Sequence, residues 1–351
     1  MIITILIFLG VLAGLILTHE LGHFASAKAF RVRVDEFGIG FPPRVFSVKR
    51  GETRYSLNAV PLGGFTKMAG EEDPKVSRSL ASKRTGVRLL VLGAGPLMNI
   101  LLPVILFSAA FVIPHDVAIG QVTVEEVAQD SPAARAGIET GDVIVSINEN
   151  SVRNINDLHR YIHLNLGQEI DVLVKHTDLI TEEFQLAPRC NPPPEEGAIG
   201  VVVNLSNPTV ISESYPPWEA APMGARECIE TFVLFKNEIA SWAIRGVTPQ
   251  VTGPVGIAQL TGEVAKAGIS PLMQFAAFIS INLAIINILP LPALDGGRIA
   301  FVLLERVRRG KRVSPRIEGL VHLIGFAILI SLILVITYQD IIRLTGGQGL
   351  P

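Results

Sequence analysis

Four long apolar segments divide the sequence, and each is free of charged side chains. They cover residues 2–17, 89–113, 269–294 and 319–339. About 20 apolar residues cross a bilayer as a helix, so each segment is long enough or nearly so. The first is the shortest, but its apolar character continues to Phe30. We therefore predict an α-helical membrane protein with four transmembrane helices. Their expected limits are residues 1–32, 87–114, 269–298 and 319–342. Gly93, Gly95, Pro96 and Pro103 should break up the second segment.

Residues 33–86 carry an alternating pattern instead of a long apolar run. Apolar and polar side chains alternate on both sides of Gly51, from Arg44 to Leu57, which is typical of a β-hairpin. We expect a membrane-associated β-hairpin region here. One interpretation is a plain cytoplasmic hairpin. The other is a strand edge beside an active site, onto which an extended substrate adds as a further strand.

Residues 115–205 have the pattern of a compact, mainly β domain inserted between the second and third helices. Short β-rich runs occur at residues 120–127, 143–147, 169–175 and 181–186, and a helix is expected at residues 155–164. The run from Ser131 to Ile138, followed by Gly141-Asp142-Val143-Ile144, resembles the PDZ signature of bacterial proteases. A PDZ domain binds peptides by strand addition. The familiar carboxylate-binding loop is not recognisable, so a peptide ligand and a size-filter role are both open.

Residues 206–268 connect this domain to the third helix. Prolines interrupt the beginning of this stretch, and residues 223–244 mix apolar and polar side chains. We expect a linker followed by an amphipathic helix on the outer membrane surface, with a plain linker helix as the alternative.

Composition and charge set the orientation. Only 18% of the residues are charged and 49% are hydrophobic, whereas a soluble domain carries about 25% charged residues. Residues 28–88 and the expected basic loop at 299–318 are rich in Lys and Arg, while residues 116–196 hold fifteen acidic and five basic side chains. Basic loops stay in the cytoplasm. We therefore expect a multi-pass protein of the inner (plasma) membrane with an extracytoplasmic PDZ domain. The net charge of −2 argues against a nucleic-acid partner.

A metal-binding pattern lies at the end of the first apolar segment, in His19-Glu20-Leu21-Gly22-His23. Histidines four residues apart lie on one face of a helix, one turn apart, which suits two ligands of one zinc ion. Glu20 between them is placed to act as general base on a water molecule. The orientation above puts this motif near the cytoplasmic end of its helix.

Zinc needs a third protein ligand, and the best candidate is Asp295. It is the only carboxylate at the cytoplasmic end of the third helix, after two prolines that end the helix and before Gly296-Gly297. Asn287 is an amide in an otherwise apolar stretch of the same helix. His322 is expected to be an ordinary polar residue of the fourth helix.

The two cysteines offer no metal site by their spacing. Cys190 and Cys228 could pair if both faced an oxidising compartment, and two unrelated cysteines are the alternative.

Taken together, the motifs resemble the site-2 protease family of intramembrane zinc metalloproteases. The resemblance rests on His19-Glu20-x-x-His23 and on Asn287-x-x-Pro290-x-Pro292-x-Leu294-Asp295-Gly296-Gly297. Residues 37–41, 61–68, 95–99 and 253–257 give supporting matches. The layout is similar to the bacterial branch with one PDZ domain between the second and third helices.

This resemblance implies a role for each motif residue. His19, His23 and Asp295 would bind Zn²⁺, Glu20 would activate water, and Asn287 would hold the substrate backbone or the developing oxyanion. The substrates would be single-pass membrane proteins, such as anti-sigma factors in regulated intramembrane proteolysis, or remnant signal peptides. The PDZ domain would screen substrates already shortened by another protease.

Two other classes of function stay open at this point. One is a catalytically inactive membrane scaffold that recruits partners through its PDZ domain. The other is a zinc carrier or sensor, although its polar residues should line a path through several helices instead of clustering at one end.

Overall fold

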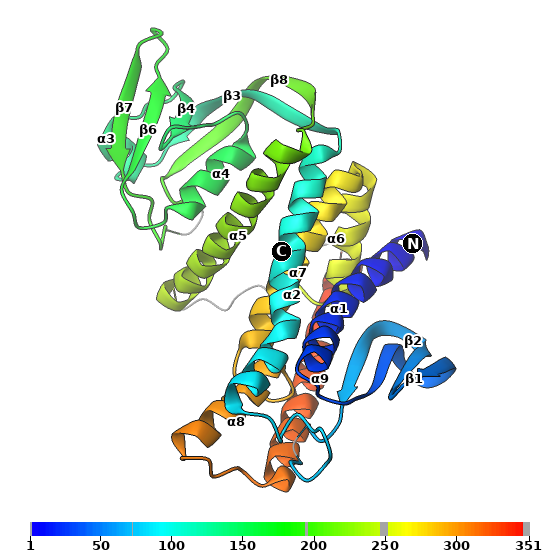
Figure 1. Ribbon diagram of the computed structural model, residues 1–351. Helices are drawn as coiled ribbons and strands as arrows, with labels where there is room; N and C mark the ends of the chain where they lie inside the picture. The colour runs from blue at the N-terminus through cyan, green and yellow to red at the C-terminus, as the bar shows by residue number, and fades with distance from the viewer. Residues whose placement is uncertain (1, 72, 194–195, 246–251, 347–351) are drawn as a thin grey trace. The chain divides into compact units, whose positions relative to one another are not determined.

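The computed structural model describes residues 2–71, 73–193, 196–245 and 252–346 (Figure 1). The chain folds as two compact units. The membrane unit comprises Met1–Ala110, Ala220–Gly224 and Gln250–Pro351, and the β-rich unit comprises Phe111–Glu219 and Ala225–Pro249. Each unit is treated by itself below.

Four helices have the length and apolar composition to cross a membrane, as the sequence predicts. They are α1 (Ile2–Ala29), α2 (Thr85–Val112), α7 (Ile269–Ile288) and α9 (Pro315–Thr345). The expected interruption of the second helix is wrong, because α2 continues through Pro96 and Pro103. Helices in membranes tolerate proline because neighbouring groups satisfy the freed backbone carbonyls.

Two further helices of the membrane unit were not expected. The first, α6 (Pro254–Ala267), lies where a linker was predicted. Asp340 of α9 caps its start, accepting hydrogen bonds from the backbone N–H groups of Gly253 and Gly256. The second, α8 (Asp295–Val307), occupies the beginning of the predicted basic loop 299–318. The connection between α7 and α9 is therefore partly helical.

The predicted hairpin is present as β1 (Val34–Arg50) and β2 (Thr53–Met68), joined at Gly51. Both strands bend, so residues 36–39 of β1 have a β2 segment on either side. Residues 54–57 flank them on one side and residues 64–67 on the other. Within the described strands, residues 64–67 therefore have β1 on one side only and form an edge of this sheet.

The β-rich unit contains a six-stranded antiparallel sheet, ordered β7-β6-β4-β3-β8 with β5 beside β4. The strands are β3 (His115–Val127), β4 (Val143–Ile147), β5 (Asn150–Ser151), β6 (Ile170–Lys175), β7 (Thr181–Leu186) and β8 (Val201–Glu213). The helices are α3 (Pro132–Ala136), α4 (Ile155–Leu164) and most of α5 (Pro217–Arg245). Since β8 continues to Glu213, the sheet extends beyond the predicted domain boundary at residue 205.

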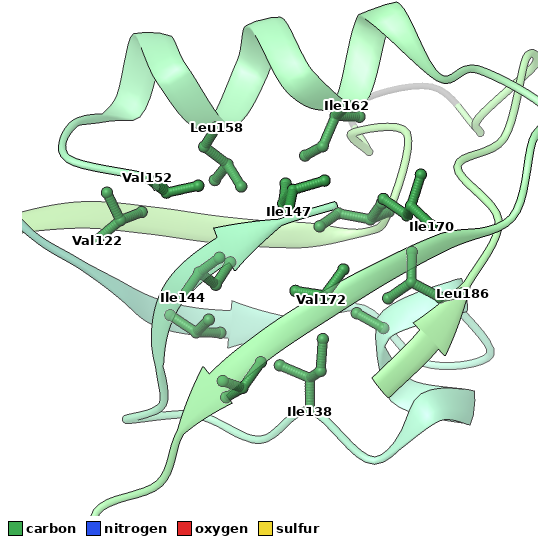
Figure 2. Close-up of a cluster of buried hydrophobic side chains, with 14 residues drawn as sticks. Val122, Ile138, Ile144, Ile147, Val152, Leu158, Ile162, Ile170, Val172 and Leu186 are labelled. Carbon is green, nitrogen blue, oxygen red and sulfur yellow. The ribbon is translucent and has the colours of Figure 1, made fainter. Parts of the chain in front are cut away.

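An apolar core holds this sheet to α4. Figure 2 shows Leu158 and Ile162 of α4 pointing towards strand residues such as Ile147 and Val172. Asn154 caps α4, accepting a hydrogen bond from the Asp157 N–H at 2.8 Å. The predicted limits of this helix are confirmed.

The predicted amphipathic helix exists as α5, and its polar residues contact α4. Arg160 of α4 forms ion pairs with Glu227 and Glu230, and Asn237 donates hydrogen bonds to backbone carbonyls at the end of α4. These contacts anchor the helix to the sheet domain, while its place on a membrane surface stays a prediction. Cys190 and Cys228 form no disulfide, so of the two alternatives left open by the sequence the structure favours two unrelated cysteines.

Candidate metal centre

The two histidines of the metal-binding motif lie on one face of α1, as their spacing requires. His19 and His23 are both buried, and their Nε2 atoms are 3.2 Å apart. Buried side chains that can be charged are rare in an apolar helix unless they have a partner or a function. The two buried nitrogens therefore indicate a polar site on this face of α1.

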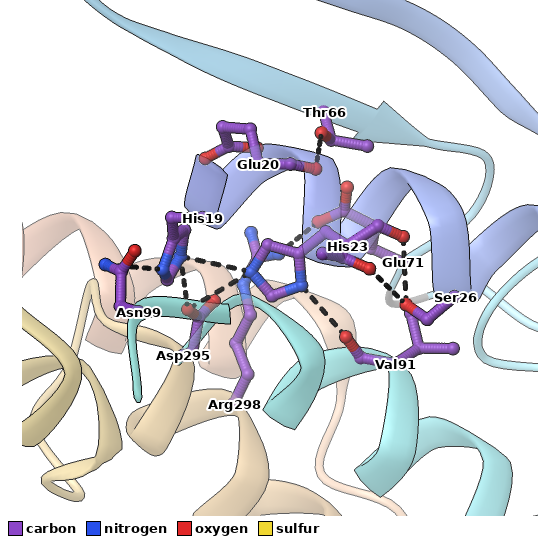
Figure 3. A network of polar contacts seen from close by, with 11 residues as sticks. His19, Glu20, His23, Ser26, Thr66, Glu71, Val91, Asn99, Asp295 and Arg298 are labelled. Atoms are coloured by element: carbon purple, nitrogen blue, oxygen red, sulfur yellow. Dashed lines mark hydrogen bonds and ion pairs between the residues drawn. The ribbon is translucent and has the colours of Figure 1, made fainter. Parts of the chain in front are cut away.

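Asp295 meets this pair although it is 272 residues from His23 in sequence. Its Oδ2 lies 3.0 Å from His19 Nε2 and 3.2 Å from His23 Nε2. Figure 3 shows the carboxylate beneath the two rings. Asp295 is the first residue of α8, so the break in helix after α7 brings it into place.

Two glycines make this break possible. A Cβ on Gly296 would lie 2.1 Å from the Leu289 carbonyl oxygen, and a Cβ on Gly297 would lie 2.3 Å from that of Leu291. Any other residue would push the first turn of α8 away from the end of α7. The two glycines therefore allow the backbone of α8 to approach that of the preceding segment closely.

The geometry of the three side chains fits a zinc ion. Donor atoms about 2.0–2.1 Å from a tetrahedral zinc lie about 3.3 Å from one another. The three distances here are 3.0, 3.2 and 3.2 Å, and two imidazoles with one carboxylate form a typical catalytic donor set. His19, His23 and Asp295 form the one His/Cys/Asp/Glu group that can hold a metal among the described residues.

Both rings have a polar partner at their second nitrogen. His23 Nδ1 lies 2.9 Å from the Val91 carbonyl oxygen, so this nitrogen carries the hydrogen and Nε2 is free to bind metal. His19 Nδ1 lies 3.5 Å from the side-chain nitrogen of Asn99, whose buried Oδ1 has no partner within the described chain. Rotating this amide by 180° makes Oδ1 the acceptor for a His19 Nδ1–H and moves Nδ2 to the position without a partner.

Small residues let α1 and α2 meet at the centre. A Cβ on Gly22 would lie 2.3 Å from the Ala94 carbonyl oxygen. A Cβ on Gly95 would lie 2.3 Å from His23 Nε2 and 2.7 Å from His19 Nε2. Gly95 therefore keeps clear the space that the metal requires. Neither Gly95 nor Asn99 received a role from the sequence, although both lie in one of its supporting motifs.

Glu20 lies between the two histidines and next to β2. Its backbone oxygen accepts a hydrogen bond from the Thr66 hydroxyl at 3.0 Å, and Gly64 packs near its side chain. The sheet edge formed by residues 64–67 thus lies against the motif helix.

Asn287 is not brought into this cluster by any contact. It is partly exposed near the end of α7 and makes no side-chain hydrogen bond within the described part of the chain. Its role stays a prediction.

Ion pairs tie α8 to the segments around the centre. Glu305 pairs with Arg88 of α2 and with Arg312, and Arg298 pairs with Glu71. Burial tends to raise the pKa of Glu305, but hydrogen bonds from the two arginines outweigh it and hold the pKa below its usual value. Glu305 is therefore charged at neutral pH.

The sequence of this chain is similar to those of known metalloproteases. The sequence profile of peptidase family M50 matches residues 7–332. The chain belongs to this family. A Clostridium acetobutylicum protein whose name describes a candidate zinc metalloprotease is 37% identical over 337 residues, covering 93% of this chain and 94% of its own. The regulator of sigma-W protease RasP of Bacillus subtilis is 30% identical over 433 aligned positions, covering 97% and 99% of the two chains.

Membership of family M50, the site-2 proteases, confirms the predicted enzyme class and cofactor. This chain is a zinc metalloprotease, and its four apolar helices are those of an integral membrane protein. The inactive scaffold finds no support in these relatives. Among solved structures, the PDZ domain of an SdrC-like protein from Listeria monocytogenes is 27% identical, with a TM-score of 0.21, and covers 23% of this chain and 85% of that domain.

Proposed function

We propose that this M50 protease hydrolyses peptide bonds within or next to the transmembrane segments of single-pass membrane proteins. One observation carries the proposal. The donor atoms of His19 and His23, on a helix long and apolar enough to cross a membrane, converge with that of Asp295, at the start of α8, at zinc-binding distances. A protease with ligands at this depth is suited to substrates that are themselves in the bilayer.

The chemistry divides between the metal and the protein. When bound, zinc would supply a Lewis acid that makes water a nucleophile at neutral pH. His19, His23 and Asp295 would hold the ion, and the Val91 carbonyl and Asn99 would orient the two rings. Glu20 takes the proton from the attacking water and passes it to the nitrogen of the departing amine.

Asn287 is proposed to stabilise the developing negative charge. Its side-chain amide would donate a hydrogen bond to the oxygen of the scissile carbonyl or to the neighbouring substrate backbone. It is free of other side-chain hydrogen bonds within the described residues, which leaves it available for this contact.

A substrate helix must unwind first, because its peptide bonds are hydrogen-bonded internally. The edge formed by residues 64–67 of β2 offers unpaired backbone groups beside Glu20. An extended substrate segment added to this edge would recover the hydrogen bonds that it loses on unwinding.

Substrate choice would involve the β-rich unit, interpreted as an extracytoplasmic PDZ domain. It would bind an extended peptide or exclude substrates that still carry a large outer domain. The metal centre would lie near the cytoplasmic side, in keeping with the basic loops. Anti-sigma factors shortened by another protease, and remnant signal peptides, are suitable substrates.

The full-length protein in liposomes, with a labelled single-pass substrate, tests the proposal. Glu20→Gln should keep its zinc and lose at least about 100-fold in cleavage rate, since general acid–base catalysis contributes that much or more. Asp295→Ala should lose both cleavage and zinc. Zinc content is measured by mass spectrometry of the metal, and the cleavage site by mass spectrometry of the products.

Glu263→Gln is the matched control, because Glu263 is exposed on α6. It should cleave as the unaltered enzyme does. Cleavage at full rate by Glu20→Gln would contradict the assigned base, and products cut only far from the membrane segment would contradict the proposed substrate class.

A further inference from the structure

The segment that delivers Asp295 contains a backbone conformation that its residue disfavours. Ala293, two residues before Asp295, has a φ of 74°. Residues with a side chain rarely adopt this left-handed region, and they persist there only when their surroundings hold them. Something outside residues 289–294 must therefore stabilise the turn that aims the third metal ligand.

One support comes from the fourth transmembrane helix. His322 of α9 lies with its Nδ1 2.9 Å from the backbone nitrogen of Ala293, so Nδ1 accepts a hydrogen bond from that N–H. The neutral ring then carries its hydrogen on Nε2, which is buried and has no hydrogen-bond partner within the described chain. The His322 ring therefore leaves its Nε2–H without a hydrogen bond in the described chain while its Nδ1 accepts the one from Ala293. The sequence had suggested only an ordinary polar residue here.

A second support lies one turn further along the same face of α9. A Cβ on Gly325 would lie 2.2 Å from the Pro292 Cβ and 2.9 Å from its carbonyl carbon. Gly325 is itself buried, although most of its neighbours in α9 are exposed. The absence of a side chain at this position lets α9 approach the turn closely enough for His322 to reach Ala293.

We propose that His322 is a positioning residue of the metal centre and that Gly325 makes its contact possible. Both hold the Pro292–Ala293 turn against α9 and so fix where the Asp295 carboxylate lies relative to His19 and His23. This inference rests on the proposed zinc ligands. It assigns a role in the active site to a helix that supplies no metal ligand.

Replacing the acceptor tests the hydrogen bond. His322→Leu removes it with little change in volume, and His322→Asn keeps an acceptor oxygen close to the position of Nδ1. The full-length protein is purified in detergent, and its zinc affinity is measured by competition with a chelator. His322→Leu should bind zinc roughly tenfold more weakly, the lower end of the loss seen when a group bonded directly to a metal ligand is removed, because His322 acts on Asp295 through the Ala293 backbone. His322→Asn should recover most of the affinity.

Cobalt substitution gives a readout that a general loss of stability would not produce. The visible spectrum of bound Co²⁺ reports the arrangement of its ligands, so it should change in His322→Leu and return in His322→Asn. Ser331→Ala is the control on α9, because the exposed Ser331 hydroxyl donates to the Ala327 carbonyl of its own helix and to nothing else in the described part of the chain. It should leave both affinity and spectrum unchanged.

Gly325→Ala tests the close approach independently of His322. It should weaken zinc binding, whereas Gly10→Ala in α1, where a Cβ would meet nothing within 4 Å, should not. Unaltered affinity and spectrum in His322→Leu would overturn the inference, as would unaltered affinity in Gly325→Ala if His322→Leu does not fold. Failure of the parent enzyme to bind zinc through Asp295 would instead overturn the proposed metal site.

Discussion

The core of the β-rich unit is a cluster of fourteen buried apolar residues, and its buried polar side chains, such as Ser131 and Asp142, bond to backbone N–H groups close by in sequence. At the metal centre of the membrane unit, the buried side chains that face one another include His19, His23 and Asn99. On their surfaces the two units differ the other way round: the membrane unit exposes apolar side chains and the β-rich unit exposes polar ones. Many leucines and isoleucines of α9 are more than half exposed, while the outer strand β7 presents mainly polar residues.

This difference follows from the two solvents. Water drives apolar side chains into the core of the β-rich unit. Lipid is as apolar as leucine, so no such force gathers the membrane helices. They meet instead where glycines allow close contact and where hydrogen bonds join them, as at Gly22 and Gly95 and between Ser280 and the Asn99 carbonyl. Some residues that pack the membrane helices together, such as Gly95 and Asn99, therefore also line the metal centre.

The largest effect should come from a single methyl group at the centre. Gly95→Ala would put a carbon where the metal has to lie, and zinc binding should weaken by more than about 100-fold, beyond the loss of an outer partner. Chelator competition measures this. Gly93→Ala, two residues away in open space, should bind zinc normally. Equal affinities would show that Gly95 has no such role.

A core truncation in the β-rich unit should lower the stability of that unit and leave zinc binding unchanged. Leu158→Ala should cost about 2–5 kcal/mol of unfolding free energy in that unit, because it leaves a cavity among buried apolar residues. Zinc affinity should not change. Leu332→Ala on the exposed face of α9 should alter stability by less than about 0.5 kcal/mol, since lipid fills the space. Pulse proteolysis in urea measures both, and a large effect at Leu332 would break the comparison.

Asn99→Leu should produce an intermediate effect. It removes the acceptor for the His19 ring, so zinc affinity should fall by roughly 10-fold or more while Asn99→Asp retains it. Isothermal titration of the metal-free enzyme with zinc measures the difference. If Asn99→Leu binds as tightly as the parent, His19 needs no partner at Nδ1.

The smallest effect concerns pH and the β-rich unit. A hydrogen bond to Asp142 and the nearby Glu182 raise the pKa of His176 above its usual value, despite some opposing desolvation. A raised pKa in the folded state stabilises the protein fully below the usual value of about 6.5 and less as pH rises through the folded value. The urea midpoint of this unit should therefore fall slightly between pH 6 and pH 9. His176→Gln should abolish this fall, and an unchanged slope would exclude His176 as its cause.

The regular elements were largely predictable from local pattern. The four membrane helices, the turn at Gly51 and the limits of α4 follow from apolar runs, alternation and capping residues that lie close together in sequence. The extra helices α6 and α8 were missed. Asp340, which caps α6, lies more than eighty residues from it, and α8 is short and follows a proline-rich break.

For the metal centre, the sequence by itself predicted the proposed ligands, because His19 and His23 are one helical turn apart and because Asp295 is the one carboxylate in its segment. Only the tertiary structure decided how the rest of the chain serves them. Gly95, Asn99 and His322 act through contacts between helices distant in sequence, and glycine or histidine in an apolar run looks the same whether it faces lipid or a ligand. Position along the chain fixes neighbours within one helix, whereas neighbours across helices depend on which face each helix buries.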